Sequence, residues 1–206
     1  MHVPKHFSEN DPEFLNTLIR SASFASLIMT EGATPMATHL PLHLAPDDGQ
    51  YGTLYGHVAR ANDHWKLFDG HATALAIFTG INAYIAPNWY ASDNQVPTWN
   101  YAAVHAYGQP EIVDQPDAVL DILYHLNKGN ENDATGVWTI DKMEPTVLHA
   151  MLKGIVAFAL PITRIEGKVK MGQNKKPEDT AGAIKGLRSA DNPMWRAVAD
   201  EMERRS

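Results

Sequence analysis

The chain has 206 residues, of which 44% are apolar and 20% charged, and these proportions are typical of a folded globular protein. Because no cysteine is present, disulfides, thiolate zinc sites, cysteine-ligated iron–sulfur clusters and cysteine nucleophiles are excluded. The formal charge of −7 disfavours nucleic acid and anionic membranes as partners. The charge is uneven, since residues 1–163 carry 7 basic and 17 acidic side chains, whereas residues 164–206 carry 10 basic and 7 acidic ones.

The first part of the chain is predicted to form one helix followed by short strands. The helix is expected from Asp11, because Asn10 or Asp11 can cap it and Pro12 suits its first turn. Strands are expected over residues 23–30, 36–44, 52–58 and 73–78, with the turn sequence at 45–49 joining the second and third of these as a hairpin and a short helical turn over 62–68.

The second part is predicted to contain more helix. Residues 79–103 are expected to be irregular and rich in aromatic side chains. Further strands are expected at 104–107 and 154–165, where Pro161 favours an edge position or a bulge, and helices at 115–128, 143–152, 180–187 and 192–205.

The order of these elements decides the fold class. Strands and helices do not alternate regularly, so a doubly wound parallel sheet is disfavoured. A mainly β fold with peripheral helices (α+β), built as a small antiparallel barrel, is predicted instead. We expect a single domain over residues 1–206 with a helical C-terminal extension from about residue 177.

The cytoplasm is the expected location. The N-terminus lacks a basic stretch followed by an apolar core, which a secretory signal requires. No apolar run approaches the ~20 residues that cross a bilayer, so no membrane association is expected.

A first candidate site is the segment from His57 to Asn62, where a predicted strand gives way to a helical turn. Free backbone N–H groups at such a junction favour an anion, and Arg60 can hold a phosphate through two parallel hydrogen bonds. His57 and Asn62 offer further donors. A strand end with a surface arginine explains the pattern equally well, so both interpretations remain open.

A second candidate is the aromatic segment over residues 85–101, which contains Trp89, Tyr90, Trp99 and Tyr101. A flat heteroaromatic ligand would stack on such rings. The polar rim of that ligand could be bound by Thr98 and Asn100. The alternative is a loop whose aromatic side chains pack on the core.

A third candidate is the basic segment from Arg164 to Lys176, which holds five of the ten basic residues in the last part of the chain. It could hold a phosphate or reach a partner's groove, whereas most charged runs are solvated turns. Gln173 and Asn174 beside lysines favour a polar site.

Metal and catalytic motifs are not apparent. His39 and His43 fall on one predicted strand, where a rise of ~3.3 Å per residue puts them about 13 Å apart, too far to share one metal alone. No HExxH spacing, serine nucleophile elbow, Walker loop or dinucleotide-binding glycine motif is present. No metal is expected, and no catalytic residue is assigned.

Several motifs together resemble the PaiB-like family of FMN-binding negative transcriptional regulators. They are MHVPKHF at the start, GHVARANDHW at 56–65, AYIAPNWY at 83–90, VPTWNY at 96–101 and IEGKVKMGQNK at 165–175, and the match extends to about Leu187. The resemblance implies an FMN-binding split β-barrel, like that of pyridoxamine-phosphate oxidases, that forms a homodimer with the flavin between subunits.

The resemblance also implies a flavin site. In split-barrel flavoproteins a Ser-Arg-Lys-like turn often holds the FMN phosphate, and here Arg60 takes the arginine's place between Ala59 and Ala61. Substitutes for the missing serine and lysine would be His57, Asn62 or Lys168. The implied cofactor-binding residues are His39, His57, Arg60, Ala61, Asn62, Thr98, Trp99, Asn100, Lys168, Gln173 and Asn174, of which Lys168, Gln173 or Asn174 could come from the partner subunit.

Three functions remain open at this point. They are an FMN-binding regulatory protein, a flavin-dependent oxidoreductase, and a split barrel that binds haem or another ligand. Direct DNA binding is doubtful, because the predicted helix 192–205 mixes Asp200, Glu201 and Glu203 with its arginines. A regulator of this kind is expected to act indirectly or through the combined basic segments of a dimer.

Overall fold

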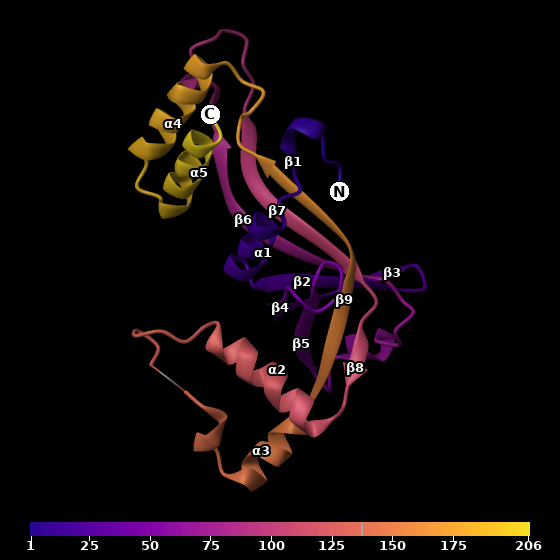
Figure 1. Ribbon diagram of the computed structural model, residues 1–206. Coiled ribbons are helices and arrows are strands. Elements are labelled where there is room, and N and C mark those ends of the chain that lie inside the picture. Colours follow the sequence, from indigo (N-terminus) through magenta and orange to yellow (C-terminus); the bar gives the residue numbers. More distant parts are fainter. Residues whose placement is uncertain (137) are drawn as a thin grey trace. The chain divides into compact units, whose positions relative to one another are not determined.

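A computed structural model of the chain describes residues 1–136 and 138–206 (Figure 1). Its strands are β1 (Ser8–Glu9), β2 (Phe24–Glu31), β3 (Thr34–Pro41), β4 (His43–Ala45), β5 (Thr53–Ala59), β6 (Ala74–Ile85), β7 (Thr98–Gly108), β8 (Glu111–Val113) and β9 (Ile155–Lys170). The α-helices are α1 (Pro12–Ser21), α2 (Pro116–Lys128), α3 (Pro145–Leu152), α4 (Pro177–Ser189) and α5 (Pro193–Arg204). In this described part of the chain, no helix is both long and apolar enough to span a bilayer.

The strands form one mostly antiparallel sheet with the order β3-β2-β6-β7-β9-β5-β4. Both β1 and β8 pair with β9 outside this path. The order begins at β3 and ends at β4, so the sheet is not closed, as in a split barrel. The mainly β fold with peripheral helices predicted from the sequence is confirmed.

The chain divides into two compact units. Unit 1 contains residues 1–18, 79–104 and 166–206, and unit 2 contains residues 19–78 and 105–165. Three long strands, β6, β7 and β9, contribute residues to both units. The single domain with a C-terminal extension stays a prediction.

Unit 2 contains the antiparallel pairs β2–β3 and β4–β5, and β5 also pairs with β9. The β2–β3 hairpin runs from the Phe24–Pro41 pair to the Glu31–Thr34 pair, and Gly32 adopts a φ of +57° in its turn. Of the predicted strand 36–44, only the part that forms β4 pairs with β5, whereas the part that belongs to β3 pairs with β2. The predicted hairpin between residues 36–44 and 52–58 is therefore correct only for the short segment after Pro41.

Three strands are longer than the sequence analysis predicted. The segment 79–103 was expected to be irregular, but β6 continues to Ile85 and β7 begins at Thr98. Ala83 and Ile85 are fully buried and alternate with partly exposed neighbours, as a strand requires. Similarly, β9 extends to Lys170, so half of the basic segment is strand rather than turn.

The edge position predicted for Pro161 is wrong, since β9 lies between β7 and β5 in the sheet order. Pro161 opposes Thr53, the last pair of the β5 ladder, and the next amide, from Ile162, donates to Gly52 O at 3.0 Å. The missing proline N–H therefore interrupts no pairing within that ladder.

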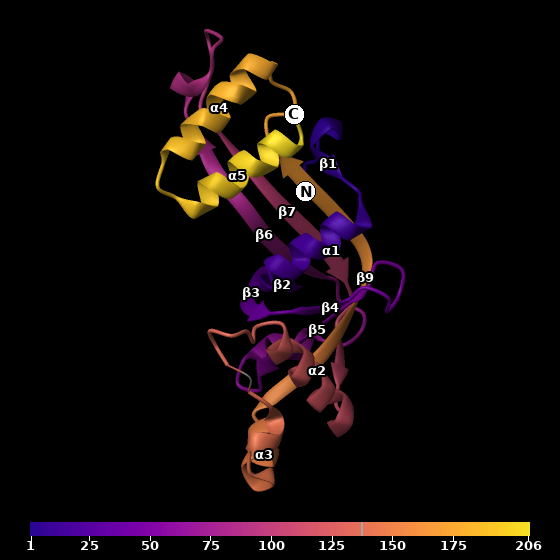
Figure 2. The same ribbon diagram turned by 60° about the vertical axis from the view of Figure 1, so that its left-hand side comes forward.

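The two C-terminal helices of unit 1 lie side by side, with α5 along β6 and β7 (Figure 2). Two glycines four residues apart let α4 approach the segment around Trp89. A Cβ on Gly182 would lie 2.0 Å from Trp89 O, and one on Gly186 would lie 2.3 Å from the indole. The indole also meets Trp195 of α5 edge to face, at 5.9 Å between ring centroids.

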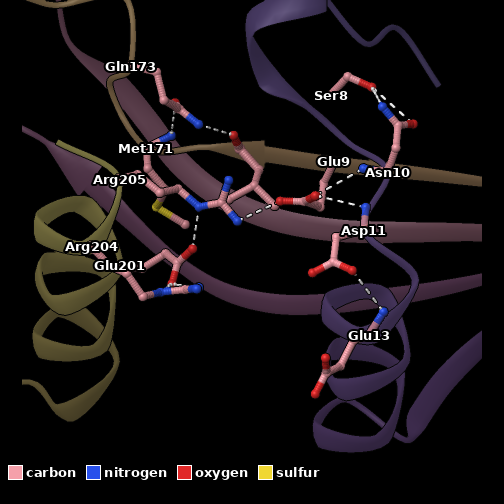
Figure 3. A network of polar contacts seen from close by, with 11 residues as sticks. Ser8, Glu9, Asn10, Asp11, Glu13, Met171, Gln173, Glu201, Arg204 and Arg205 are labelled. Carbon is pink, nitrogen blue, oxygen red and sulfur yellow. Dashed lines mark hydrogen bonds and ion pairs between the residues drawn. The ribbon is translucent and has the colours of Figure 1, made fainter.

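The N-terminal segment is joined to α5 by charged side chains (Figure 3). Arg205 Nη2 donates to Glu9 Oε2 at 2.7 Å, and Arg205 Nε donates to Glu201. Arg204 is bonded to the same Glu201. Since Glu9 and Glu201 are only 14% and 10% exposed, these ion pairs are better shielded from solvent than ordinary surface pairs.

We expect Gly182→Ala to destabilise the fold by about 1–3 kcal/mol, because the new methyl group would meet backbone rather than a movable side chain. Urea unfolding measures this. The matched control is Lys185→Ala at an exposed position of the same helix, where a change within about 0.5 kcal/mol is expected. Equal effects of the two substitutions would contradict the close packing.

Candidate functional site

The turn after β5 is fastened to β3 by side-chain hydrogen bonds. Asn62 caps the short helix Asp63–Leu67 by accepting the amide of His64 at 3.1 Å, which confirms the predicted helical turn. Its amide nitrogen donates to Thr38 Oγ1 at 3.0 Å, and that hydroxyl lies 2.8 Å from His64 Nδ1. The hydroxyl of Thr38 therefore joins Asn62 to the imidazole of His64.

Arg60 is held at the exposed end of β5. Its Nε donates to Lys153 O at 2.7 Å and its Nη2 to Ile155 O at 2.8 Å, so two of the five guanidinium protons are used. The indole of Trp65 lies 6.0 Å from the guanidinium carbon. The other three guanidinium N–H groups have no hydrogen-bond partner among the described residues, and Ala61 beside them is exposed. A fixed, exposed guanidinium with open donors suits an anion.

His57 lies on a different side of this segment from the Thr38 network. Its ring lines a cavity of about 190 Å³ formed mostly by apolar side chains of α2, α3 and the segment between them. Within the described residues its Nδ1 is buried without a hydrogen-bond partner, and burial lowers its pKa. Arg60 instead lines a separate pocket of about 300 Å³ with Trp65 and Val113.

His39 is exposed on β3 and hydrogen-bonds Ser26 at 2.9 Å through Nδ1. The ring of Phe24, which is 71% exposed, stacks beside it at 6.5 Å. Because successive strand residues point to opposite faces, His39 and Thr38 point away from each other. The structure therefore brings Asn62 next to Thr38 but does not bring His39 into that network.

Unit 1 holds the remaining predicted residues on β7, β9 and the turn after β9. Trp99 is 54% exposed and meets Tyr84 edge to face at 6.0 Å. Thr98 accepts a hydrogen bond from Lys170, which also donates to Trp99 O at 2.9 Å. These residues form an exposed aromatic surface with an adjacent ammonium group.

Asn100 points the other way on β7. It is 2% exposed, and its amide nitrogen lies 3.3 Å from Met202 Sδ in the core of unit 1. Neighbouring strand residues alternate between faces, so Trp99 and Asn100 do not share a surface. A direct contact of Asn100 with a ligand stays a prediction.

The last predicted residues lie near the end of β9. Lys168 donates to His2 O at 3.0 Å and lies 5.1 Å from the ring of Tyr101. Gln173 shapes the turn, since it accepts the Met171 amide and donates to Val169 O, both at 2.7 Å. Asn174 is exposed. Lys168, Gln173 and Asn174 lie in unit 1, whereas the residues around Arg60 lie in unit 2.

Sequence reasoning missed three side chains at these positions. Thr38 and His64 connect β3 to the Arg60 turn, and Lys170 lies beside Trp99. The alternation of Lys168 and Lys170 was a usable signal, because lysines two apart on a strand share a face. The Thr38–His64 contact carried no local signal, since the two residues are 26 apart. In the described part of the chain, no group of three or more metal-ligating side chains converges.

We predict that acid destabilises the protein through its buried histidines. Burial lowers the pKa of His57 and His64 from the ordinary value of 6.5. Below that value the unfolded chain takes up protons that these folded imidazoles do not, so stability falls as the pH decreases from about 7.5 to about 5.5. Urea unfolding at the two pH values measures the difference.

His64→Gln should flatten this pH dependence, whereas His71→Gln, at an exposed position, should leave it unchanged. A slope that is the same in both variants would contradict the assignment to His64.

Comparison with known proteins identifies the family to which the chain belongs. A family model described as "Putative FMN-binding domain" matches residues 1–164. "Protease synthase and sporulation protein PAI 2" of Bacillus subtilis is 34% identical over 204 residues, which cover 98% of this chain and 97% of that protein.

Solved structures share the fold. The flavocytochrome Anf3 from Azotobacter vinelandii superposes with a TM-score of 0.65 at 16% identity, covering 82% of this chain and 72% of that one. An FAD and heme binding protein from Mycobacterium smegmatis gives 0.59 at 17% identity, covering 79% and 73%. These likenesses identify the split-barrel fold. The family model and the relative in Bacillus subtilis carry the assignment further: this chain belongs to the PaiB-like family of FMN-binding proteins.

Proposed function

We propose that this chain binds FMN as a homodimer, with the flavin between subunits, and acts as a regulatory protein. The family match supports the cofactor. The phosphate of FMN is proposed to bind at Arg60. Two backbone carbonyls orient its guanidinium group, and three of its N–H donors have no partner among the described residues. Asn62 and Ala61 complete this turn, and the missing Ser and Lys of the usual turn leave Arg60 as its only charged side chain.

Within unit 1, the surface around Trp99 is the candidate for contact with the flavin ring. An exposed indole supported by Tyr84 offers a stacking platform, and Thr98 with Lys170 offers polar contacts at its edge. Lys168, Gln173 and Asn174 would come from the partner subunit, and His39 and His57 remain secondary candidates. When bound, FMN supplies redox chemistry and visible absorbance, while the chain's own residues bind and orient it.

The homodimer is supported by exposed apolar side chains in both units. Phe24, Val96 and Trp99 are 71%, 68% and 54% exposed. Phe24 belongs to unit 2 and Val96 and Trp99 to unit 1, and each is available to a subunit interface. A cytoplasmic location, consistent with the absence of cysteine, belongs to the same proposal.

An FMN titration followed by visible absorbance tests the proposal. We expect saturable binding of one FMN per chain, and light scattering should give a mass of two chains. Arg60→Ala should raise the Kd on the order of ten- to hundredfold, because it removes charge-assisted bonds worth about 1.5–3 kcal/mol. Lys66→Ala, at an exposed lysine of the short helix that follows this turn, is the control and should change the Kd little.

Absence of saturable flavin binding would refute the proposal as a whole. Flavin binding with an unchanged Kd in Arg60→Ala would refute only the assignment of the phosphate to this turn.

Regulation by direct contact with DNA is not supported by the C-terminal helices. Their arginines are engaged by carboxylates at 2.7–2.8 Å, as in Arg188 with Asp200 and Glu203, and Arg196 with Asp191. Arg204 and Arg205 are likewise paired with Glu201. Since a paired arginine must lose its carboxylate before it can bind a backbone phosphate, we assign the regulatory effect to an indirect route.

We therefore predict weak, nonspecific DNA binding. Promoter and random duplexes should bind with equal affinity, and binding should vanish as salt rises from about 50 to about 200 mM. Fluorescence anisotropy across this series measures it. Saturable binding of the promoter duplex alone at the higher salt concentration would overturn the indirect route.

A further inference from the structure

A further pocket in unit 2 is lined by none of the residues assigned above to the flavin site. It has a volume of about 420 Å³ and lies between the last turn of α1, the start of β4 and the end of α2. Its walls combine apolar side chains, Leu42, Leu44 and Leu126, with an unusual number of basic ones. Leu42 and Leu44 are 2% exposed, so the apolar wall belongs to the packed core and holds its shape.

Four basic side chains line this pocket from three separate elements. They are Arg20 of α1, His43 of β4, and His125 and Lys128 of α2. Among the described residues, neither Arg20 nor Lys128 forms an ion pair with a carboxylate, and Lys128 lies 5.6 Å from the ring centroid of Tyr124. The pocket therefore gathers positive charge without an internal counterion for these two side chains.

The imidazoles of His43 and His125 stack face to face, with 4.8 Å between the ring centroids and 18° between the ring planes. Two protonated imidazoles at this separation repel each other unless an anion lies nearby. Burial, then His125 and Arg20, lower the pKa of His43, while Asp121 raises it.

The other titratable groups near the pair do not replace an anion. Asp121 is 3.7 Å from His125 Nε2 but is 72% exposed, so solvent weakens its effect. Tyr55, which opposes His43 on β5, is bonded to Asp48, and its pKa is raised to about 12, so it stays neutral. Tyr124 meets His125 edge to face at 5.3 Å.

We propose that this pocket binds a small organic molecule carrying a phosphate, sulfate or carboxylate group. The oxyanion contacts Arg20, Lys128 and the imidazole pair, and the apolar part of the molecule lies against the leucines. Because the bound anion favours the protonated form of His43, binding takes up a proton and strengthens as the pH falls.

Sulfate is a suitable probe, because its charge is constant between about pH 6 and about pH 8, where histidine titrates. FMN-loaded protein is titrated with sulfate while the ring signals of His43 and His125 are followed by NMR. Saturable shifts of both rings are expected, with a Kd at least about tenfold lower at pH 6 than at pH 8. Arg20→Gln and Lys128→Gln should each raise the Kd about tenfold, because each removes a charge-assisted contact.

His71→Gln, which changes an exposed histidine outside this pocket, is the matched control and should leave the sulfate Kd unchanged. Repeating the titration with a phosphate monoester and with a dicarboxylate distinguishes the sources of the oxyanion. The proposal is overturned if neither ring responds saturably to any of the three probes, or if the Arg20 and Lys128 variants behave like the control. Release of FMN by sulfate, seen by absorbance, would show that the pocket belongs to the flavin site and would also overturn it.

Discussion

The pairing of β9 is the constraint on which the other features depend. This strand of 16 residues pairs with β5 and β8 in unit 2 and with β1 in unit 1. The carbonyl of Ile155, its first residue, orients Arg60 together with the carbonyl of Lys153, which precedes the strand. Its last residues include Lys168 and Lys170. One strand therefore contributes to the backbone of unit 1 and to that of unit 2, and each group of proposed flavin-binding residues is held within its own unit.

The positive charge of the last part of the chain separates into two kinds of side chain. The arginines of α4 and α5 form ion pairs with carboxylates of the same unit, and Arg205 with Glu9 and Glu201 is the best shielded of these. The lysines instead bond to neutral oxygens, as Lys170 does with Thr98 and Lys175 with Gln95. A lysine with a neutral partner has no carboxylate to compensate its charge, so the lysines rather than the arginines give this segment its capacity for anions.

Local signals predicted most of the elements but not the long strands. Pro12, Asn62 and Pro193 stand at helix starts, where caps and first-turn prolines are informative over a few residues. The extensions of β6, β7 and β9 depend on partners distant in sequence, so a segment such as 79–85 showed only short alternation around Ala83 and Ile85. The Arg60 turn was predicted from its own sequence, whereas its attachment through Thr38 and the carbonyls of residues 153–155 was not, because those partners are 24 to 95 positions away.

The abundance of histidine acquires a physical meaning only when each ring's neighbours are known. Burial lowers the pKa of His43, His57 and His64 alike. For His64 the consequence is structural, since a neutral ring completes the bond to Thr38. For His57 the ring closes an apolar cavity. His43 differs because cations, and not only apolar atoms, lower its pKa, and an anion can reverse that effect, whereas no ligand can restore water to a ring enclosed by leucines and methionines. His43, which is surrounded by like charge, is therefore suited to respond to an anionic ligand.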